Sequence, residues 1–185
     1  MPDPQWYWGA VVRVDGADGL LTAIGRVVDG DRVRAQDPAT GHITLFYAPL
    51  RGGDGAAELS ARAAAAIAAL PAFDLRCAGF GEFPSPDRPV AWLDIAEGRA
   101  ALDALRLALC GCDEDCHRHA FVPHLTLAYG EDAGAYADAR AAIRAEAEHA
   151  DIAVRIDALW IAGFPADGHP ARDLRYVERL PLAAG

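Results

Sequence analysis

Two short motifs hold the residues of this sequence that are best suited to chemistry. Each reads His-x-Thr-Leu, as HITL at residues 42–45 and as HLTL at residues 124–127, a separation of 82 positions (124 minus 42). Both segments are rich in residues that favour β-strands, and alternate side chains of a strand point to opposite faces. The histidine and threonine of each motif therefore share one face, which suits a site, while the other face suits a core.

Two such strands facing each other across a groove would present two imidazoles and two hydroxyls to one volume. Opening a strained phosphodiester needs one group to take a proton from water and another to give a proton to the leaving oxygen. Imidazole titrates near neutral pH, so His42 and His124 can supply the base and the acid, in either order. Thr44 and Thr126 can donate hydrogen bonds to the non-bridging phosphate oxygens. This scheme requires no metal ion and no cofactor.

The composition limits the partners that the protein can have. A net charge of −10 at pH 7 disfavours extended nucleic-acid binding through many phosphates, although a local site for one or two phosphates remains possible. All 17 basic residues are arginine, which excludes Schiff-base lysines, pyridoxal anchors and P-loop lysines. The chain contains neither a long apolar run nor the basic and apolar start of a signal peptide. We expect a monomer in the cytoplasm that does not bind membranes.

The remainder of the chain must position the two motifs. The 185 residues, 52% of them hydrophobic, suit one globular domain or two small fused lobes. Strand-like composition predicts strands over residues 5–15, 41–50, 73–83, 89–97, 119–130, 151–164 and 173–182. Helical propensity and stop signals predict helices over residues 19–29, 54–70, 97–109 and 133–149. The recurrence of the motif strand followed by a helix indicates two lobes related by a pseudo-twofold axis.

The paired motifs, with matching strands around them, resemble those of the two-histidine phosphoesterase superfamily. The resemblance extends over nearly the whole chain and is greatest to the LigT branch, the RNA 2′,3′-cyclic phosphodiesterases once described as 2′-5′ RNA ligases. It implies a bilobal α+β fold in which two antiparallel sheets line a central cleft and helices pack outside, as a single domain over residues 1–185. It also implies that His42 and His124 are catalytic and that Thr44 and Thr126 bind phosphate.

The sequence departs from this family at two places that would carry charge in the cleft. Many relatives have an arginine five places after the second motif histidine, where this chain has Tyr129, and a basic residue four places after the first, where it has Phe46. We expect both residues to contact the substrate, with Phe46 on the same face as His42 and Thr44, where it could stack on a nucleobase. Another arginine must then bind phosphate, and the candidates are Arg13, Arg76, Arg118 and Arg175.

A segment rich in cysteine and histidine precedes the second motif and allows a different interpretation. Its five soft ligands could hold a structural zinc ion, although their spacing matches no standard zinc site; they are Cys110, Cys112, Cys116, His117 and His119. A disulfide and unliganded loop cysteines are the alternatives. Outside this segment, we expect Cys77 and the tryptophans to be core residues, and His149 and His169 to lie at the surface.

The favoured prediction is metal-independent hydrolysis of 2′,3′-cyclic phosphodiesters on RNA ends or small nucleotides. The family resemblance favours a 2′-phosphate as the product. Three alternatives stay open: a non-catalytic nucleotide or RNA-end binding protein, a 2′-5′ RNA ligase acting through the same cleft, and a metal- or redox-responsive module built on the cysteine and histidine segment.

Overall fold

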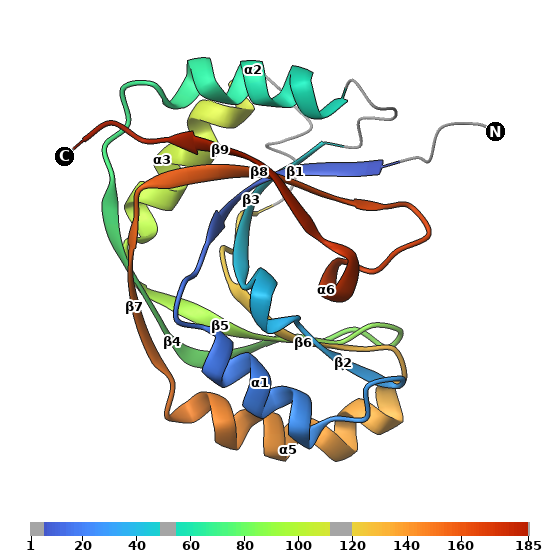
Figure 1. Cartoon of the computed structure of the whole chain (residues 1–185). Helices are drawn as coiled ribbons and strands as arrows, with labels where there is room; N and C mark the ends of the chain where they lie inside the picture. Colours follow the sequence, from blue (N-terminus) through green and yellow to red (C-terminus); the bar gives the residue numbers. More distant parts are fainter. Residues whose placement is uncertain (1–5, 49–54, 112–119, 185) are drawn as a thin grey trace.

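The computed structural model describes residues 6–48, 55–111 and 120–184, in which two antiparallel sheets lie one above the other (Figure 1). The first sheet has the strand order β3 (His42–Ala48), β1 (Trp6–Arg13), β8 (Ala158–Pro165) and β9 (Arg175–Pro181). The second has the order β2 (Val33–Ala35), β6 (Leu125–Gly130), β5 (Val90–Glu97), β4 (Phe73–Phe83) and β7 (Asp151–Ile156). The HITL motif lies in the first sheet and the HLTL motif in the second, so each sheet contributes one histidine–threonine pair.

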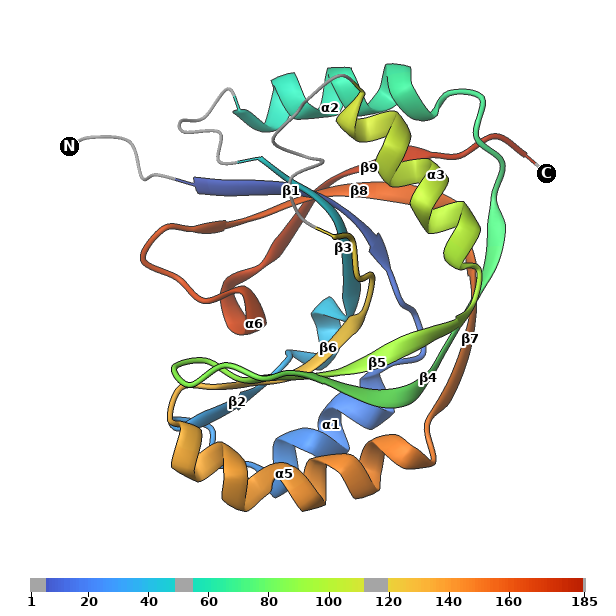
Figure 2. The same cartoon turned by 180° about the vertical axis from the view of Figure 1, so that it is seen from behind.

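Helices cover the outer faces of both sheets (Figures 1 and 2). The first sheet is covered by α2 (Gly55–Ile67) and α3 (Arg99–Cys110), and the second by α1 (Asp18–Val27) and α5 (Ala133–Glu148). A short 3₁₀ helix, η1 (Pro38–Thr40), precedes β3, and α6 (Pro170–Asp173) lies between the two sheets on their open side. The predicted α+β class with antiparallel sheets is confirmed. Among the described residues, no helix is long and apolar enough to cross a membrane.

The helices form because their apolar residues recur at helical spacing, and α5 in addition has a side-chain cap at its start. In α2, Leu59, Ala63 and Ile67 lie four residues apart and are buried. Asp132 caps α5, where its carboxylate accepts a hydrogen bond from the Ala135 backbone at 2.7 Å. Before α3, Gly98 has a φ of 88°, and a Cβ there would come within 2.6 Å of the Asp74 carbonyl oxygen, so only glycine fits.

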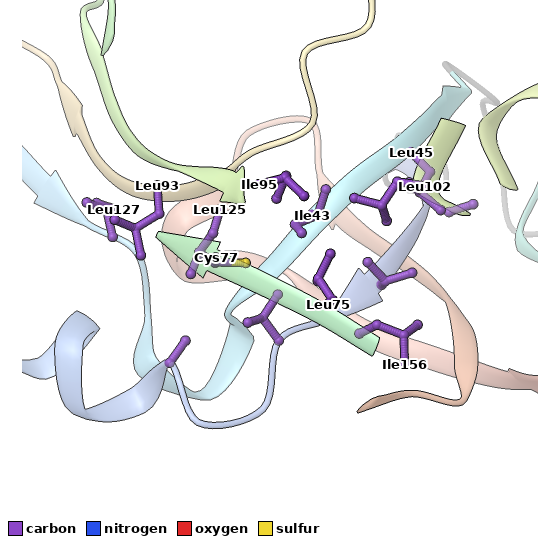
Figure 3. Close-up of a cluster of buried hydrophobic side chains, with 14 of the residues drawn as sticks. Ile43, Leu45, Leu75, Cys77, Leu93, Ile95, Leu102, Leu125, Leu127 and Ile156 are labelled. Atoms are coloured by element: carbon purple, nitrogen blue, oxygen red, sulfur yellow. The ribbon is translucent and has the colours of Figure 1, made fainter. Parts of the chain in front are cut away.

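The core joins apolar residues of both sheets with those of the helices that cover them, α1, α2, α3 and α5. Both motif strands point apolar residues into it, as do β4, β5, β7 and α3 (Figure 3). The labelled members of this cluster are Ile43, Leu45, Leu75, Cys77, Leu93, Ile95, Leu102, Leu125, Leu127 and Ile156. The core prediction for Cys77 is confirmed, because its thiol is fully buried and burial raises its pKa to about 12. Packing of these apolar side chains fixes the two motif strands, and with them the histidines and threonines on their other faces.

Two predicted strands differ from the observed ones for identifiable reasons. The segment 151–164 is two strands rather than one, because β7 belongs to the second sheet and β8 to the first. The chain crosses between the sheets at Asp157, whose carboxylate pairs with Arg179 at 2.7 Å and whose carbonyl accepts the Leu182 N–H at 2.9 Å. The strand predicted over 119–130 begins only at Leu125; Pro123, which has no N–H to donate, lies just before it.

Candidate active site

The two motif histidines lie close together where β3 and β6 approach each other. His42 is the first residue of β3, and His124 immediately precedes β6. Burial is the main cause that lowers the pKa of His42, and a positive charge on His124 lowers it further. The two motifs, 82 positions apart (124 minus 42) in the sequence, therefore meet where β3 and β6 are in contact.

Each histidine is held in the same way. The Nδ1 atom of His42 lies 2.6 Å from the carbonyl oxygen of Thr40, and the Nδ1 atom of His124 lies 2.7 Å from that of Val122. A carbonyl oxygen can only accept a hydrogen bond, so Nδ1 carries the proton in both rings. In the neutral ring Nε2 is then the basic nitrogen, and each histidine is oriented to exchange a proton through that atom.

Gln36 supports the first histidine and links it to the second motif strand. Its Nε2 atom donates to the Thr40 hydroxyl at 2.7 Å and lies 3.3 Å from the Thr40 carbonyl oxygen. The same carbonyl oxygen accepts the hydrogen bond from His42 Nδ1. The Gln36 backbone N–H donates to the Leu127 carbonyl in β6 at 2.9 Å. Gln36 is only 1% exposed. Gln36 could not be predicted from the sequence, because nothing in a single glutamine outside a motif signals such a role.

Burial lowers the pKa of both catalytic candidates below the ordinary histidine value. Desolvation is the largest cause for His42, and the hydrogen bond to Thr40 opposes it. The same two effects act on His124, with Val122 as the opposing partner. Both imidazoles are therefore biased toward their neutral, proton-accepting form in the free protein.

A β-bulge occurs at the same place in each motif strand. In β3, Val11 of β1 pairs with Thr44 and Ala10 pairs with Phe46, so Leu45 has no partner. In β6, the partners from β5 skip Leu127 in the same way. An extra residue shifts the alternation of side chains from that point onward.

These bulges decide which aromatic residues face the cleft. Tyr47 pairs with Gly9 and thus shares the face of Thr44 and His42, whereas Phe46 points to the opposite side. The prediction that Phe46 lies on the histidine face is wrong, because strict alternation was assumed through Leu45. Phe46 is 5% exposed and packs in the core. Its ring centroid lies 4.7 Å from the guanidinium carbon of Arg62 in α2.

The second bulge gives Tyr129 the position that Tyr47 has in the first strand. Tyr129 pairs with Val90 and lies on the face of Thr126. The internal repeat is therefore longer than the two predicted motifs, as HITLFY and HLTLAY. A tyrosine recurs five places after each histidine, and the bulge brings both tyrosines to the cleft.

A cavity of about 140 Å³ opens beside these residues. His42, Thr44, Tyr47 and Tyr129 all line it, together with residues of β1, β8 and α6. An aromatic wall rises at one side, where the ring of Phe164 lies 5.4 Å from that of Tyr7 and 6.0 Å from that of Tyr47. Both tyrosines of this wall are partly exposed, at 39% and 46%.

His124 lies in aromatic surroundings of its own. Its ring is 4.9 Å from that of Phe83, in an edge-to-face arrangement, and 5.7 Å from that of Trp92. Trp92 shares the face of Thr126 and lies against Gly81, where a Cβ would come within 2.3 Å of the indole ring. The prediction of Trp92 as a core residue is thus incomplete, because its half-buried ring also flanks the catalytic candidate.

Two of the four predicted phosphate-binding arginines, Arg13 and Arg76, are engaged elsewhere. Arg13 pairs with Asp15 at 2.8 Å and lies over the Tyr176 ring. Arg76 binds Asp151 and Glu97 at 2.6 and 3.3 Å. Arg175 is exposed on β9, and Arg118 lies outside the described residues.

Most of the segment predicted as a metal site lies outside the described residues. Cys110 ends α3, where it is buried and disulfide-bonded, so its sulfur is not a free thiolate. Cys112, Cys116, His117 and His119 lie outside the described residues. Within the described ranges, no three histidine, cysteine or carboxylate side chains are grouped to hold a metal ion.

The two remaining histidines differ from each other. His149 is exposed at the end of α5, as predicted. His169 is only 8% exposed, and its Nδ1 atom accepts the Ala171 N–H at the start of α6, so its prediction as a surface residue is wrong. The turn-like sequence around His169 indicated exposure, but α6 folds inward between the sheets.

Comparison with known proteins agrees with this arrangement. The model of the 2′-5′ RNA ligase superfamily matches residues 21–166. LigT of E. coli in its apo form has the same fold, with a TM-score of 0.64 and 15% identity over 97% of this chain and 98% of that one. The protein TT0787 of Thermus thermophilus has a TM-score of 0.63 and 16% identity, covering 96% of this chain and 97% of that one.

A eukaryotic protein shares the fold as well. Usb1 of Kluyveromyces marxianus has a TM-score of 0.54 and 14% identity, over 95% of this chain and 98% of that one. None of the curated protein sequences matches. The family match spans both histidine motifs, and the fold matches span nearly the whole chain. The protein therefore belongs to the 2′-5′ RNA ligase superfamily of two-histidine phosphoesterases and has the LigT-like fold.

Proposed function

We propose that the protein hydrolyses 2′,3′-cyclic phosphodiesters on RNA ends or small nucleotides, with His42 and His124 as the acid–base pair. The observation that carries this proposal is the shared anchoring of the two imidazoles. Each donates a hydrogen bond from Nδ1 to a backbone carbonyl, which leaves Nε2 for proton transfer, and a positive charge on His124 adds to the effect of burial in lowering the pKa of His42. A base and an acid on opposite sides of a phosphorus atom are what in-line displacement requires.

The reaction then follows from the chemistry of the two nitrogen atoms. One neutral Nε2 takes a proton from water as its oxygen forms a bond to phosphorus. The other histidine, protonated, gives its Nε2 proton to the ribose oxygen as the phosphorus–oxygen bond breaks. Donation to the 3′ oxygen leaves a 2′-phosphate, the outcome that the family resemblance favours. With an RNA 5′-hydroxyl in place of water, the same two histidines would join two RNA ends: the base takes the hydroxyl proton as the 5′ oxygen bonds to phosphorus, and the acid protonates the departing 3′ oxygen, which leaves a 2′-5′ phosphodiester.

Thr44 and Thr126 are the expected ligands of the non-bridging phosphate oxygens. Each lies two residues after its histidine on the same face, and a hydroxyl donor there would stabilise charge that develops during displacement. The cavity of about 140 Å³ is smaller than the pockets that enclose whole nucleotides. We therefore expect it to hold the sugar and phosphate.

The nucleobase would then lie against the exposed edge of the cavity. Tyr7 and Tyr47 offer partly exposed rings there, and base stacking on aromatic side chains tolerates any base. LigT of E. coli has been solved in complexes with 3′-AMP and with phosphate, which supports a nucleotide ligand for this cleft as well.

Product analysis tests the proposal against the alternatives. The protein is incubated with each nucleoside 2′,3′-cyclic monophosphate and with a short RNA ending in a 2′,3′-cyclic phosphate, and the products are identified by ³¹P NMR. Accumulation of a 2′-monoester supports the proposal. Saturable binding without any monoester indicates the non-catalytic binding protein, and joining of a 5′-hydroxyl RNA to a 2′,3′-cyclic end indicates the ligase.

A further inference from the structure

Arg34 lies beside Tyr129 on the cleft side of the second sheet. The strand β2 pairs with β6 so that Arg34 is directly opposite Tyr129, and paired residues share a face. The neighbours of Arg34 point the other way: Val33 is buried in the core, and Ala35 lies near Gly25 of α1. The Arg34 side chain is therefore directed into the space between the sheets, on the side where α6 lies (Figure 1).

The guanidinium of Arg34 has no partner within the part of the chain that the structure describes. Its Nε atom is buried without a hydrogen bond, and no carboxylate forms an ion pair with it. A buried donor without an acceptor is costly, and most such groups in folded proteins are satisfied. An unsatisfied, permanently charged fork of donors beside a cleft is suited to an anion that binds there.

Glu131, the acidic residue of this cluster, already has two other partners. The Glu131 carboxylate binds Arg88 at 3.2 Å and the His169 Nε2 atom at 2.8 Å. Because His169 Nδ1 accepts the Ala171 N–H, the proton of the neutral ring is on Nε2, the atom that approaches Glu131. Burial is the main cause that lowers the pKa of His169, and the charges of Arg34 and Arg88 lower it further, so both arginines belong to its surroundings.

Tyr129 connects this cluster to the catalytic residues. Its ring lies 4.9 Å from that of His169 on one side, and it lines the cavity with His42 and Thr44 on the other. Arg34 therefore lies on the strand next to Tyr129, and Tyr129 lines the cavity in which the reacting phosphate is proposed to bind. In a chain with a net charge of −10, it is a local cation beside the cleft that remains unneutralised by the described residues.

We propose that Arg34 binds a second phosphate of the substrate, so that the preferred substrate carries a 5′-phosphate or 5′-phosphodiester in addition to its 2′,3′-cyclic phosphate. This inference rests on the proposed function. The guanidinium would bind two phosphate oxygens through parallel hydrogen bonds, which would satisfy the buried Nε atom. Arg88, held nearby by Glu131, would add positive potential without direct contact.

The test compares Arg34→Gln with wild type on substrates that differ by one phosphate. We measure kcat/KM on a nucleoside 2′,3′-cyclic phosphate and on its 5′-phosphorylated form. The variant should lose at least tenfold on the 5′-phosphorylated substrate and less than twofold on the other. Arg26→Gln, which removes the same charge from an exposed position on α1, should leave both values unchanged. Equal losses on both substrates, or no loss on either, would overturn the inference.

A second arm separates this inference from the proposed function. Binding of a nucleoside 3′,5′-bisphosphate and of the 3′-monophosphate is measured by calorimetry, which requires no turnover. Wild type should bind the bisphosphate at least tenfold more tightly, and Arg34→Gln should lose this preference; equal affinity in wild type contradicts the second phosphate site. A dinucleotide with a 2′,3′-cyclic end shows which kind of molecule supplies the second phosphate. A higher kcat/KM than for the 5′-phosphorylated mononucleotide indicates an RNA end, and equal values indicate a free nucleotide.

Discussion

The β-bulge at Leu45 predicts opposite effects for two adjacent aromatic residues. Phe46 lies on the core side of the bulge and Tyr47 on the cleft side. Replacing each with alanine should therefore separate stability from activity. The two substitutions remove rings of similar size from neighbouring positions of one strand, so each serves as the control for the other.

The size of each effect follows from burial. Phe46 is 5% exposed, and truncation of a buried phenylalanine to alanine costs about 3–5 kcal/mol. For a protein of this size, about 2–4 °C in Tm is lost for each kcal/mol, so Phe46→Ala should lower Tm by roughly 6–20 °C. Tyr47 is 46% exposed, and we expect its removal to cost about 1 kcal/mol through its contacts with neighbouring rings. If it stacks on a base, kcat/KM should fall roughly 5- to 150-fold.

Urea unfolding and steady-state kinetics measure the two effects independently. Phe46→Ala should lower the urea midpoint with an unchanged m-value, while Tyr47→Ala should change kcat/KM and lower the midpoint by only about a third of that amount or less. Tyr47→Phe keeps the ring, so it should retain activity within about threefold if stacking is the contribution. The reverse pattern, with stability lost at Tyr47 and activity lost at a stable Phe46 variant, would refute the position of the bulge.

Two further predictions concern the histidines and their support. Burial lowers the pKa of His42 below its unfolded value near 6.5, so the unfolded chain binds the proton more readily. The free energy of unfolding should therefore be unaffected by this group above about pH 6.5 and should fall as the pH drops below it. Between pH 7 and 5, the free energy of unfolding should fall less in His42→Asn than in wild type, by at most about 1.4 kcal/mol per pH unit, and an equal loss in both proteins would contradict this. Gly81→Ala should displace the indole of Trp92 and thereby disturb His124, lowering kcat about tenfold with the 2′,3′-cyclic substrate; unchanged kcat would show that Trp92 does not position the histidine.

The histidine and threonine positions could be predicted because they depend on a local pattern. A strand places residues i and i+2 on one face, and a repeated motif indicates two such faces, so His42 and His124 could be paired without knowing the fold. The same rule gave the wrong face to Phe46, since a bulge breaks the alternation and Leu45 carries no signal for one. A bulge is set by the pairing with β1, which is a tertiary contact.

Arg34, the proposed ligand of the second phosphate, could not be predicted from the sequence for a related reason. Arg34 belongs to β2, a strand of three residues, which is too short for a periodic pattern to indicate. Its position opposite Tyr129 depends on pairing with a strand almost a hundred residues later in the chain, and its lack of a carboxylate partner depends on Arg88 and His169 both binding Glu131. Single-sequence reasoning could recognise that an arginine was needed in the cleft but not which one.

The central claim, that His42 and His124 act as an acid–base pair without a metal ion, is tested most directly by turnover of a nucleoside 2′,3′-cyclic phosphate in EDTA. Asparagine replaces each histidine, because its amide can still donate to the Thr40 or Val122 carbonyl while losing proton transfer. His149→Asn, at an exposed position on α5, is the matched control. We predict that wild type and the control keep full activity in EDTA and that each motif variant loses at least about 100-fold. Turnover within tenfold of wild type in either motif variant, or its abolition by EDTA, would contradict the claim.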